Sequence, residues 1–232
     1  MRRILVAIIL ALTPFSVGGV ELDIGGTTIR VPTPAGLAHL TSDIQPMYDV
    51  SIDMTTPQNE RLVTFVDEAI IPEALSGEMP TFERYINVEI MRDLKSTRVT
   101  AADFAEFKKM AHAQLEQTIR SMEQKMPGMM ENMSERVGDT LDMDVAFSLN
   151  NVVPLPIHQE SERTIASSSI VKYDMAATGS ASDHIVTSTS TFVFLKGRII
   201  FVYVYGGPKD LTWTRDQAER WIDEVIVLNT KN

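Results

Sequence analysis

Apolar and polar residues alternate along several short stretches of the chain. This pattern predicts β-strands, because neighbouring side chains of a strand face opposite sides of its sheet. In RYINVEIM (84–91) the two sets are Tyr85, Asn87, Glu89 and Met91 on one face and Ile86, Val88 and Ile90 on the other. Further extended segments are predicted at 20–30, 48–54, 61–66, 144–153, 164–173, 185–195 and 198–205.

Glycine-containing turns divide two of these segments. Gly25-Gly26 predicts a turn inside the first one. Lys196-Gly197 predicts a two-residue hairpin between 185–195 and 198–205. RIIFVYVY (198–205) is apolar on both faces, so we expect this strand at the centre of the sheet, covered on both sides.

One long helix is predicted after the strand at 84–91. Thr100, with Asp103 three residues later, is a variant of the helix-capping box. Apolar residues then recur at spacings of three and four and form one helical face: Phe104, Phe107, Ala111, Leu115, Ile119, Met122 and Met126. Pro127-Gly128 interrupts this face, because a proline disfavours helical geometry in the residue before it. The helix is therefore predicted over 100–126, followed by a shorter one over 127–137.

A second amphipathic helix is predicted near the end of the chain. Thr214 marks its start, and the face that carries Trp221 is expected to anchor a helix of about 214–227 against the sheet. No period of 20–50 residues repeats and no low-complexity linker divides the sequence. We expect 20–232 to form a single α+β domain, in which an antiparallel sheet packs against the helices 100–126 and 214–227.

The first residues have the pattern of an export signal. Arg2 and Arg3 precede an apolar run from Ile4 to Leu12, and small residues follow up to Gly19. The run is shorter than the roughly 20 residues that a membrane-spanning helix needs. We expect residues 1–19 to be a signal peptide and the protein to be periplasmic or secreted. A retained N-terminal anchor is the alternative.

Composition narrows the possible functions. The chain has no cysteine, which excludes disulfides, thiolate metal sites and cysteine nucleophiles. It has 21 Lys and Arg against 31 Asp and Glu, a net charge of −10, which becomes −12 if the two arginines at positions 2 and 3 leave with a signal peptide. This charge disfavours nucleic acid as a partner. No later segment is long and apolar enough to span a bilayer, so an unidentified protein or small ligand is the expected partner.

Three parts of the sequence together resemble a known fold family. They are the P-x-P of VPTPAG (31–36), the hairpin FVFLKGRIIFVYVY (192–205) and the closing WTRDQAERWIDEV (213–225). Over about 25–35 and 185–229 the chain resembles uncharacterised exported bacterial proteins and, more loosely, the PsbP-like α/β/α sandwich. PsbP-like proteins mostly act as non-catalytic assembly or accessory factors. The resemblance therefore implies binding rather than catalysis, and it implies no functional residue.

The segment MEQKMPGMMENM (122–133) is the most chemically distinctive part of the chain. Its methionines are Met122, Met126, Met129, Met130 and Met133. Most of them extend the apolar helical face, and methionine fills irregular gaps in a core, so packing is the first interpretation. Thioethers also bind Cu(I), and a break at Pro127-Gly128 would let four of them converge on a copper ion. As a third interpretation, Met129, Met130 and Met133 could form an adaptable surface for a partner.

Catalytic and metal-binding motifs are not found. The sequence has no G-x-S-x-G, H-E-x-x-H, Walker loop or G-x-G-x-x-G. The four histidines have no metal-ligand spacing, and the serines of 167–169 and 188–190 are expected to face solvent in strands. Asp139, Asp142 and Asp144 are close together but lack the EF-hand spacing, so a solvated loop is expected.

These observations predict an exported, non-catalytic binding or accessory protein without a cofactor. A periplasmic copper-handling protein that uses the five methionines is the alternative. An unrecognised hydrolase is the third interpretation, and no catalytic residue can be named for it.

Overall fold

The computed structural model describes residues 19–78, 80–81, 83–177 and 180–230, without the side chains of 114–123, 180 and 181. The predicted signal peptide lies outside the described residues, except for Gly19, which begins the first strand. In the described part of the chain, every helix is too short or too polar to cross a membrane.

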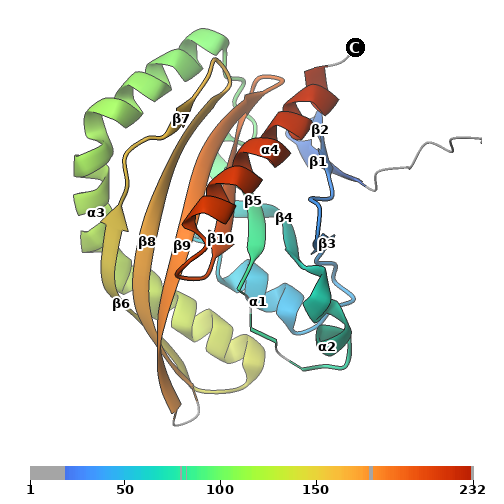
Figure 1. The fold of residues 1–232 in the computed structure, drawn as a ribbon, viewed down its shortest axis with the longest axis vertical. Coiled ribbons are helices and arrows are strands. Elements are labelled where there is room, and N and C mark those ends of the chain that lie inside the picture. Colours follow the sequence, from blue (N-terminus) through green and yellow to red (C-terminus); the bar gives the residue numbers. More distant parts are fainter. Residues whose placement is uncertain (1–18, 79, 82, 178–179, 231–232) are drawn as a thin grey trace, which may run out of the picture.

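Most strands belong to one eight-stranded sheet (Figure 1). Their spatial order is β3-β4-β5-β10-β9-β8-β6, with β7 beside β8, and all neighbours are antiparallel. The strands are β3 (Leu37–His39), β4 (Asn59–Asp67), β5 (Tyr85–Met91), β6 (Val145–Pro154), β7 (Gln159–Glu160), β8 (Thr164–Ala177), β9 (Ser180–Leu195) and β10 (Arg198–Gly206). The α+β class is thus confirmed, and β10 lies inside the sheet as predicted.

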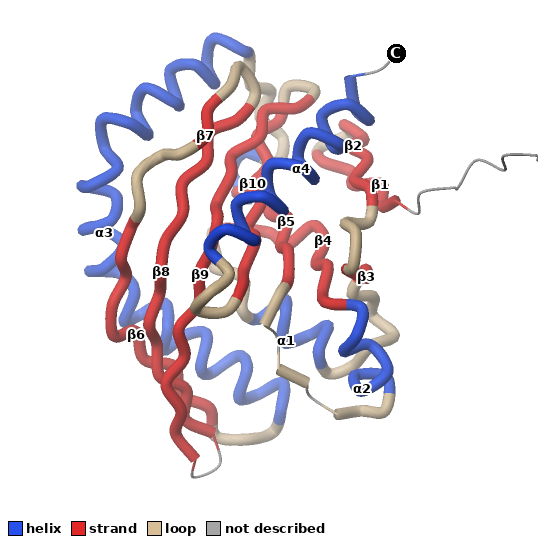
Figure 2. The backbone as a smooth tube through the Cα atoms, viewed as in Figure 1, coloured by secondary structure: helices blue, strands red, loops and turns tan. Residues whose placement is uncertain are grey.

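In the described part of the chain, a separate hairpin and four α-helices pack around this sheet. The hairpin is β1 (Gly19–Ile24) and β2 (Thr27–Pro32), and its turn is at Gly25-Gly26 as predicted. The helices are α1 (Met47–Asp53), α2 (Ile71–Leu75), α3 (Ala101–Leu141) and α4 (Leu211–Thr230). Figure 2 shows α4 crossing one face of the sheet, while α3 curves around the edge formed by β6 and continues towards α1 on the other face.

The first face of the sheet forms the main core together with α4 and the β1-β2 hairpin. Trp221 of α4 is 2% exposed and lies edge-on to Phe65 of β4, with ring centroids 5.7 Å apart. Its Nε1 donates to the Pro32 carbonyl at 2.8 Å. Burying a large aromatic side chain stabilises by about 1.5–3 kcal/mol, so the predicted role of Trp221 as an anchor is confirmed.

On the second face, the start of α3 covers only part of the sheet. The Thr100–Asp103 capping box is formed. Phe104 is fully buried and stacks on Phe194 at 5.6 Å, while Phe107 meets Phe192 edge-on at 5.0 Å. This aromatic contact fixes the first turns of α3 over β9.

Two sequence-based predictions of secondary structure are wrong. Residues 48–53 of the segment predicted as a strand lie in α1, because the residues that this helix buries, Met47, Val50 and Ser51, have helical rather than alternating spacing. α3 does not end near Met126 but continues through Pro127 to Leu141. An internal proline removes one hydrogen bond and bends a helix. Contacts beyond the proline hold the continuing turns: Arg136 donates to the Thr55 carbonyl at 2.9 Å, and Thr140 to Asp53.

Candidate functional site

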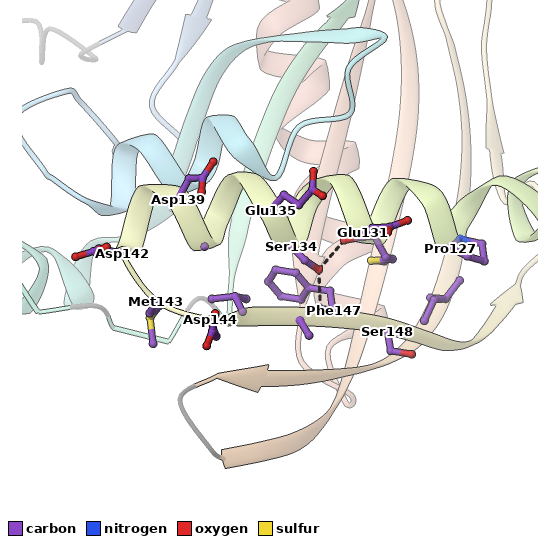
Figure 3. A pocket seen from close by; sticks show the side chains of 15 residues that line it. Pro127, Glu131, Ser134, Glu135, Asp139, Asp142, Met143, Asp144, Phe147 and Ser148 are labelled. Carbon is purple, nitrogen blue, oxygen red and sulfur yellow. Dashed lines mark hydrogen bonds between the residues drawn. The ribbon is translucent and has the colours of Figure 1, made fainter.

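A groove of about 950 Å³ lies between the second half of α3 and the start of β6 (Figure 3). Its helical residues recur at spacings of three and four, so they form one stripe along α3 and its C-cap. They are Pro127, Met130, Glu131, Ser134, Glu135, Gly138, Asp139 and Asp142. The chain then returns antiparallel to the helix and supplies Met143, Asp144, Val145, Ala146, Phe147, Ser148 and Leu149.

A tight connection positions the two walls of the groove. Asp142 adopts a left-handed conformation with φ 50°, and the Met143 N–H donates to the Gly138 carbonyl at 3.1 Å. A Cβ atom on Gly138 would lie 2.9 Å from the Met143 carbonyl oxygen, so the close approach requires glycine. The Ser134 hydroxyl accepts from the Phe147 N–H at 2.8 Å and donates to the Met130 carbonyl at 2.7 Å, which ties strand to helix.

The groove combines an acidic rim with apolar walls. Its charged side chains are all carboxylates: Glu131, Glu135, Asp139, Asp142 and Asp144. All five residues are exposed, and Figure 3 shows Glu131, Glu135 and Asp139 on the side of α3 away from β6. The apolar residues Met130, Met143, Phe147 and Leu149 are half-buried. Such a surface can bind a ligand that carries positive charge next to apolar groups.

The predicted acidic loop is therefore part of a groove. Asp139, Asp142 and Asp144 all line it. Within 19–78, 80–81, 83–177 and 180–230, no group of three or more His, Asp or Glu side chains is arranged to hold a metal ion. The three aspartates thus contribute negative charge along the groove.

The methionines predicted as a site lie along one continuous helix. Met126, Met129, Met130 and Met133 are half-buried, Met130 lines the groove, and the side chain of Met122 lies outside the described residues. The break at Pro127-Gly128 that would let the thioethers converge is absent. Packing, copper binding and a partner surface all stay predictions for this segment.

A second polar region lies on the sheet face that α3 covers only in part. Glu89 of β5 is 5% exposed and accepts a hydrogen bond from Asn59 at 2.8 Å. Burial raises the pKa of the Glu89 carboxyl, and the Asn59 hydrogen bond and the Arg61 charge oppose this shift. Beside it, Thr64 donates to Asn87 Oδ1 at 2.8 Å. Sequence alternation placed Asn87 and Glu89 on one face, but it did not indicate that this face is buried.

The serines predicted to face solvent include buried ones. Ser168 and Ser188 are 3% and 6% exposed. Ser168 shares a hydrogen bond with Thr189 at 3.0 Å, and Ser169 with Ser188 at 2.8 Å. The prediction fails because β8 and β9 lie inside the sheet, where hydroxyl groups on adjacent strands satisfy each other.

The histidines are dispersed, as predicted. His112 bonds Glu160 at 2.7 Å, and His184 bonds Ser182 at 2.7 Å. Burial lowers the pKa of His39 and of His158. The four histidines thus lie in four separate environments and do not form one cluster.

Comparison with known proteins shows distant structural likeness only. No protein-family model and no curated sequence matches the chain. It is similar to the Ran-binding protein Mog1p of Saccharomyces cerevisiae, with 9% identity and a TM-score of 0.33, over 92% of this chain and 95% of that one. It is also similar to cyanobacterial PsbP (CyanoP) from Synechocystis sp., with 12% identity and a TM-score of 0.26, over 87% and 84%. A Pseudomonas aeruginosa protein of unknown function has 10% identity and a TM-score of 0.20, over 92% and 96%.

Proposed function

We propose that this chain is a non-catalytic binding protein that takes a basic, partly apolar segment of a partner protein in the groove between α3 and β6. The observation that carries the proposal is the combination of five carboxylates with apolar walls in one groove. Complementary charge steers a cationic segment to the rim, and apolar contact then holds it.

Two further considerations support a binding role. The sequence resembles PsbP-like proteins, which mostly act as accessory factors. We therefore propose a PsbP-like sandwich fold together with the binding role. The leader pattern at 1–19 supports action outside the cytoplasm, in the periplasm or after secretion.

Fluorescence anisotropy with a labelled peptide of alternating lysine and leucine tests the groove. We expect Glu131→Lys combined with Glu135→Lys to weaken binding about tenfold, or roughly 1.4 kcal/mol, since both residues line the groove and the change reverses two of its five negative charges. Added salt should also weaken binding, because exposed charges are screened.

A matched charge reversal on α4 separates the groove from the overall negative charge. Glu219→Lys combined with Asp223→Lys changes the net charge equally at two exposed positions. Affinity should stay close to wild type in this control, and a peptide of alternating lysine and serine should bind more weakly. Equal losses in both double variants would show general adsorption and would refute the groove as the binding site.

A further inference from the structure

The methionines carry the sulfur chemistry of this chain, because the sequence contains 13 of them and no cysteine. Two of them line the groove between α3 and β6, namely Met130 of α3 and Met143 of the connection to β6. Oxidation of a thioether to a sulfoxide turns a flexible apolar side chain into a polar one. The groove therefore contains groups through which an oxidant can change its surface.

Burial separates the methionines that an oxidant reaches from those that it does not reach. Met47 is 0% exposed in a core cluster, so the fold shields its sulfur. Met130 and Met143 are half-buried and border a groove of about 950 Å³, which admits a molecule as small as hydrogen peroxide. Met110 is 52% exposed, but it lies about 30 Å from Met130 along the helix, at a rise of 1.5 Å per residue.

Oxidation of the two groove methionines changes the groove without opening the core. In the part of the chain that the structure describes, Met130 and Met143 lie outside the buried apolar clusters. Together with the half-buried Phe147 and Leu149, they supply apolar surface to the walls of the groove. These walls lose apolar surface when the two thioethers become polar, while the core that stabilises the fold stays intact.

The charge of the groove is not changed by this reaction. A sulfoxide is uncharged, so the five carboxylates of the rim still attract a basic segment. The apolar contact that holds the segment after this first encounter is what decreases. An oxidised groove therefore still attracts its partner but releases it more readily.

We propose that Met130 and Met143 are modification sites, at which oxidation by a peroxide releases the partner segment from the groove. This inference rests on the proposed function of the groove. The sulfur of each thioether attacks one peroxide oxygen, so that an S–O bond forms and the O–O bond breaks. Sulfur loses two electrons, and the second oxygen leaves as water with both peroxide protons. A methionine sulfoxide reductase reverses the change, because a dithiol is oxidised to a disulfide and the sulfoxide oxygen leaves as water.

Hydrogen peroxide treatment of the full chain tests this proposal, with anisotropy of the labelled lysine–leucine peptide as the readout. Mass mapping should find one added oxygen on Met130, one on Met143 and none on Met47. The affinity of the wild-type chain should then fall about tenfold.

The outcomes of this experiment distinguish the inference from the proposed function. A chain that binds the peptide equally well before and after both groove methionines gain oxygen would overturn the inference and leave the proposed function standing. Groove methionines that gain no oxygen would do the same. A chain that does not bind the peptide even before oxidation would overturn both.

Leucine variants separate the groove from the other methionines. Met130→Leu combined with Met143→Leu keeps apolar side chains of similar volume and removes both sulfurs from the groove. After peroxide treatment, its affinity should match that of its own untreated sample. Met110→Leu combined with Met129→Leu is the matched control, because neither is among the described residues that line the groove. This control should lose affinity as the wild type does, and equal losses in both double variants would refute the assignment.

If the groove variant does not fold, a reduction step on the wild-type chain provides the test. Methionine sulfoxide reductases for both sulfoxide epimers, with dithiothreitol, should restore peptide affinity. A loss that persists after mass mapping shows both thioethers restored would overturn the proposal. Thermal melts of the oxidised chain should stay close to those of the untreated chain, because neither residue belongs to the core clusters. A large drop in melting temperature would instead attribute the loss of binding to unfolding and overturn the proposal.

Discussion

Individual residues show where the environment changes a side chain's chemistry. Glu89 is an acidic residue in the interior, with Asn59 donating to one of its oxygens. Arg84, by contrast, forms two hydrogen bonds with Asp210, at 2.7 and 3.0 Å, next to the start of α4. This pair holds the pKa of Asp210 below its ordinary value. The pKa values of the two carboxyl groups are therefore shifted in opposite directions, that of Glu89 upwards and that of Asp210 downwards.

Replacing Glu89 should change the pH dependence of stability. Because burial raises the pKa of Glu89 in the folded state, the folded protein keeps a proton that the unfolded chain has already lost. Stability from this group is present below the unfolded pKa and is lost as pH rises through the folded pKa. We expect Glu89→Gln to be more stable than wild type at pH 7 and to match it in acid, as measured by thermal melts from pH 4 to pH 8.

Glu224→Gln is the control for this prediction. Glu224 is exposed on α4, so its replacement should alter stability by no more than about 0.5 kcal/mol at any pH. A wild-type protein that gains stability relative to Glu89→Gln between pH 4 and pH 7 would contradict the expected sign.

At the scale of elements, α3 shows tertiary contacts overriding local signals. Pro127-Gly128 has the weakest helix propensity in the segment, yet the helix continues for more than three turns beyond it. Ser134 accepts a hydrogen bond from Phe147 of β6. Arg136 donates to the Thr55 carbonyl just after α1, and Thr140 donates to Asp53, the last residue of α1. These contacts place the second half of α3 beside β6 and so create one wall of the groove.

Two glycines of α3 should respond oppositely to alanine. A Cβ on Gly128 has no heavy atom within 4 Å, so Gly128→Ala should stabilise the protein by about 0.8–1.0 kcal/mol through helix propensity. Gly138→Ala should destabilise it, because its Cβ would lie 2.9 Å from the Met143 carbonyl oxygen. Urea denaturation measures both. A loss of stability in Gly128→Ala would show that α3 is not a regular helix at this position.

At the scale of the whole molecule, one sheet separates two different interiors. The face under α4 and the β1-β2 hairpin is mostly apolar, whereas the face towards α1 and α3 combines phenylalanines with tyrosines, amides and Glu89. The first face supplies the stability that a cysteine-free chain needs from its core alone. The groove between α3 and β6 lies away from that core.

Removal of a signal peptide would change the mass and the location of the whole molecule. Mass spectrometry of the chain recovered from producing cells should show loss of about residues 1–19, because Arg2 and Arg3 followed by Ile4–Leu12 form a signal pattern. Ile8→Arg, which breaks the apolar run, should retain the full mass and remain inside the cell. A wild-type chain of full mass in the exported fraction would instead indicate the N-terminal anchor.

Local patterns in the sequence identified several of the elements. Alternation identified β5 and the β9-β10 hairpin, and spacings of three and four identified the start of α3 and the helix that carries Trp221. These predictions succeed because the period of apolar residues depends only on backbone geometry. The absence of cysteine and the negative charge were likewise readable from the chain alone.

Only the tertiary structure decided where α3 ends, which strands are neighbours and which polar residues are buried. Asp142 and Phe147 line one groove because the chain reverses after α3, and Asn87 meets Tyr203 because β5 pairs with β10, more than a hundred residues later. Neither juxtaposition has a local signal. Strand order and helix docking depend on the apolar surface buried over the whole molecule. This burial comes from contacts between segments that are distant in sequence, so the pattern within one segment does not predict it.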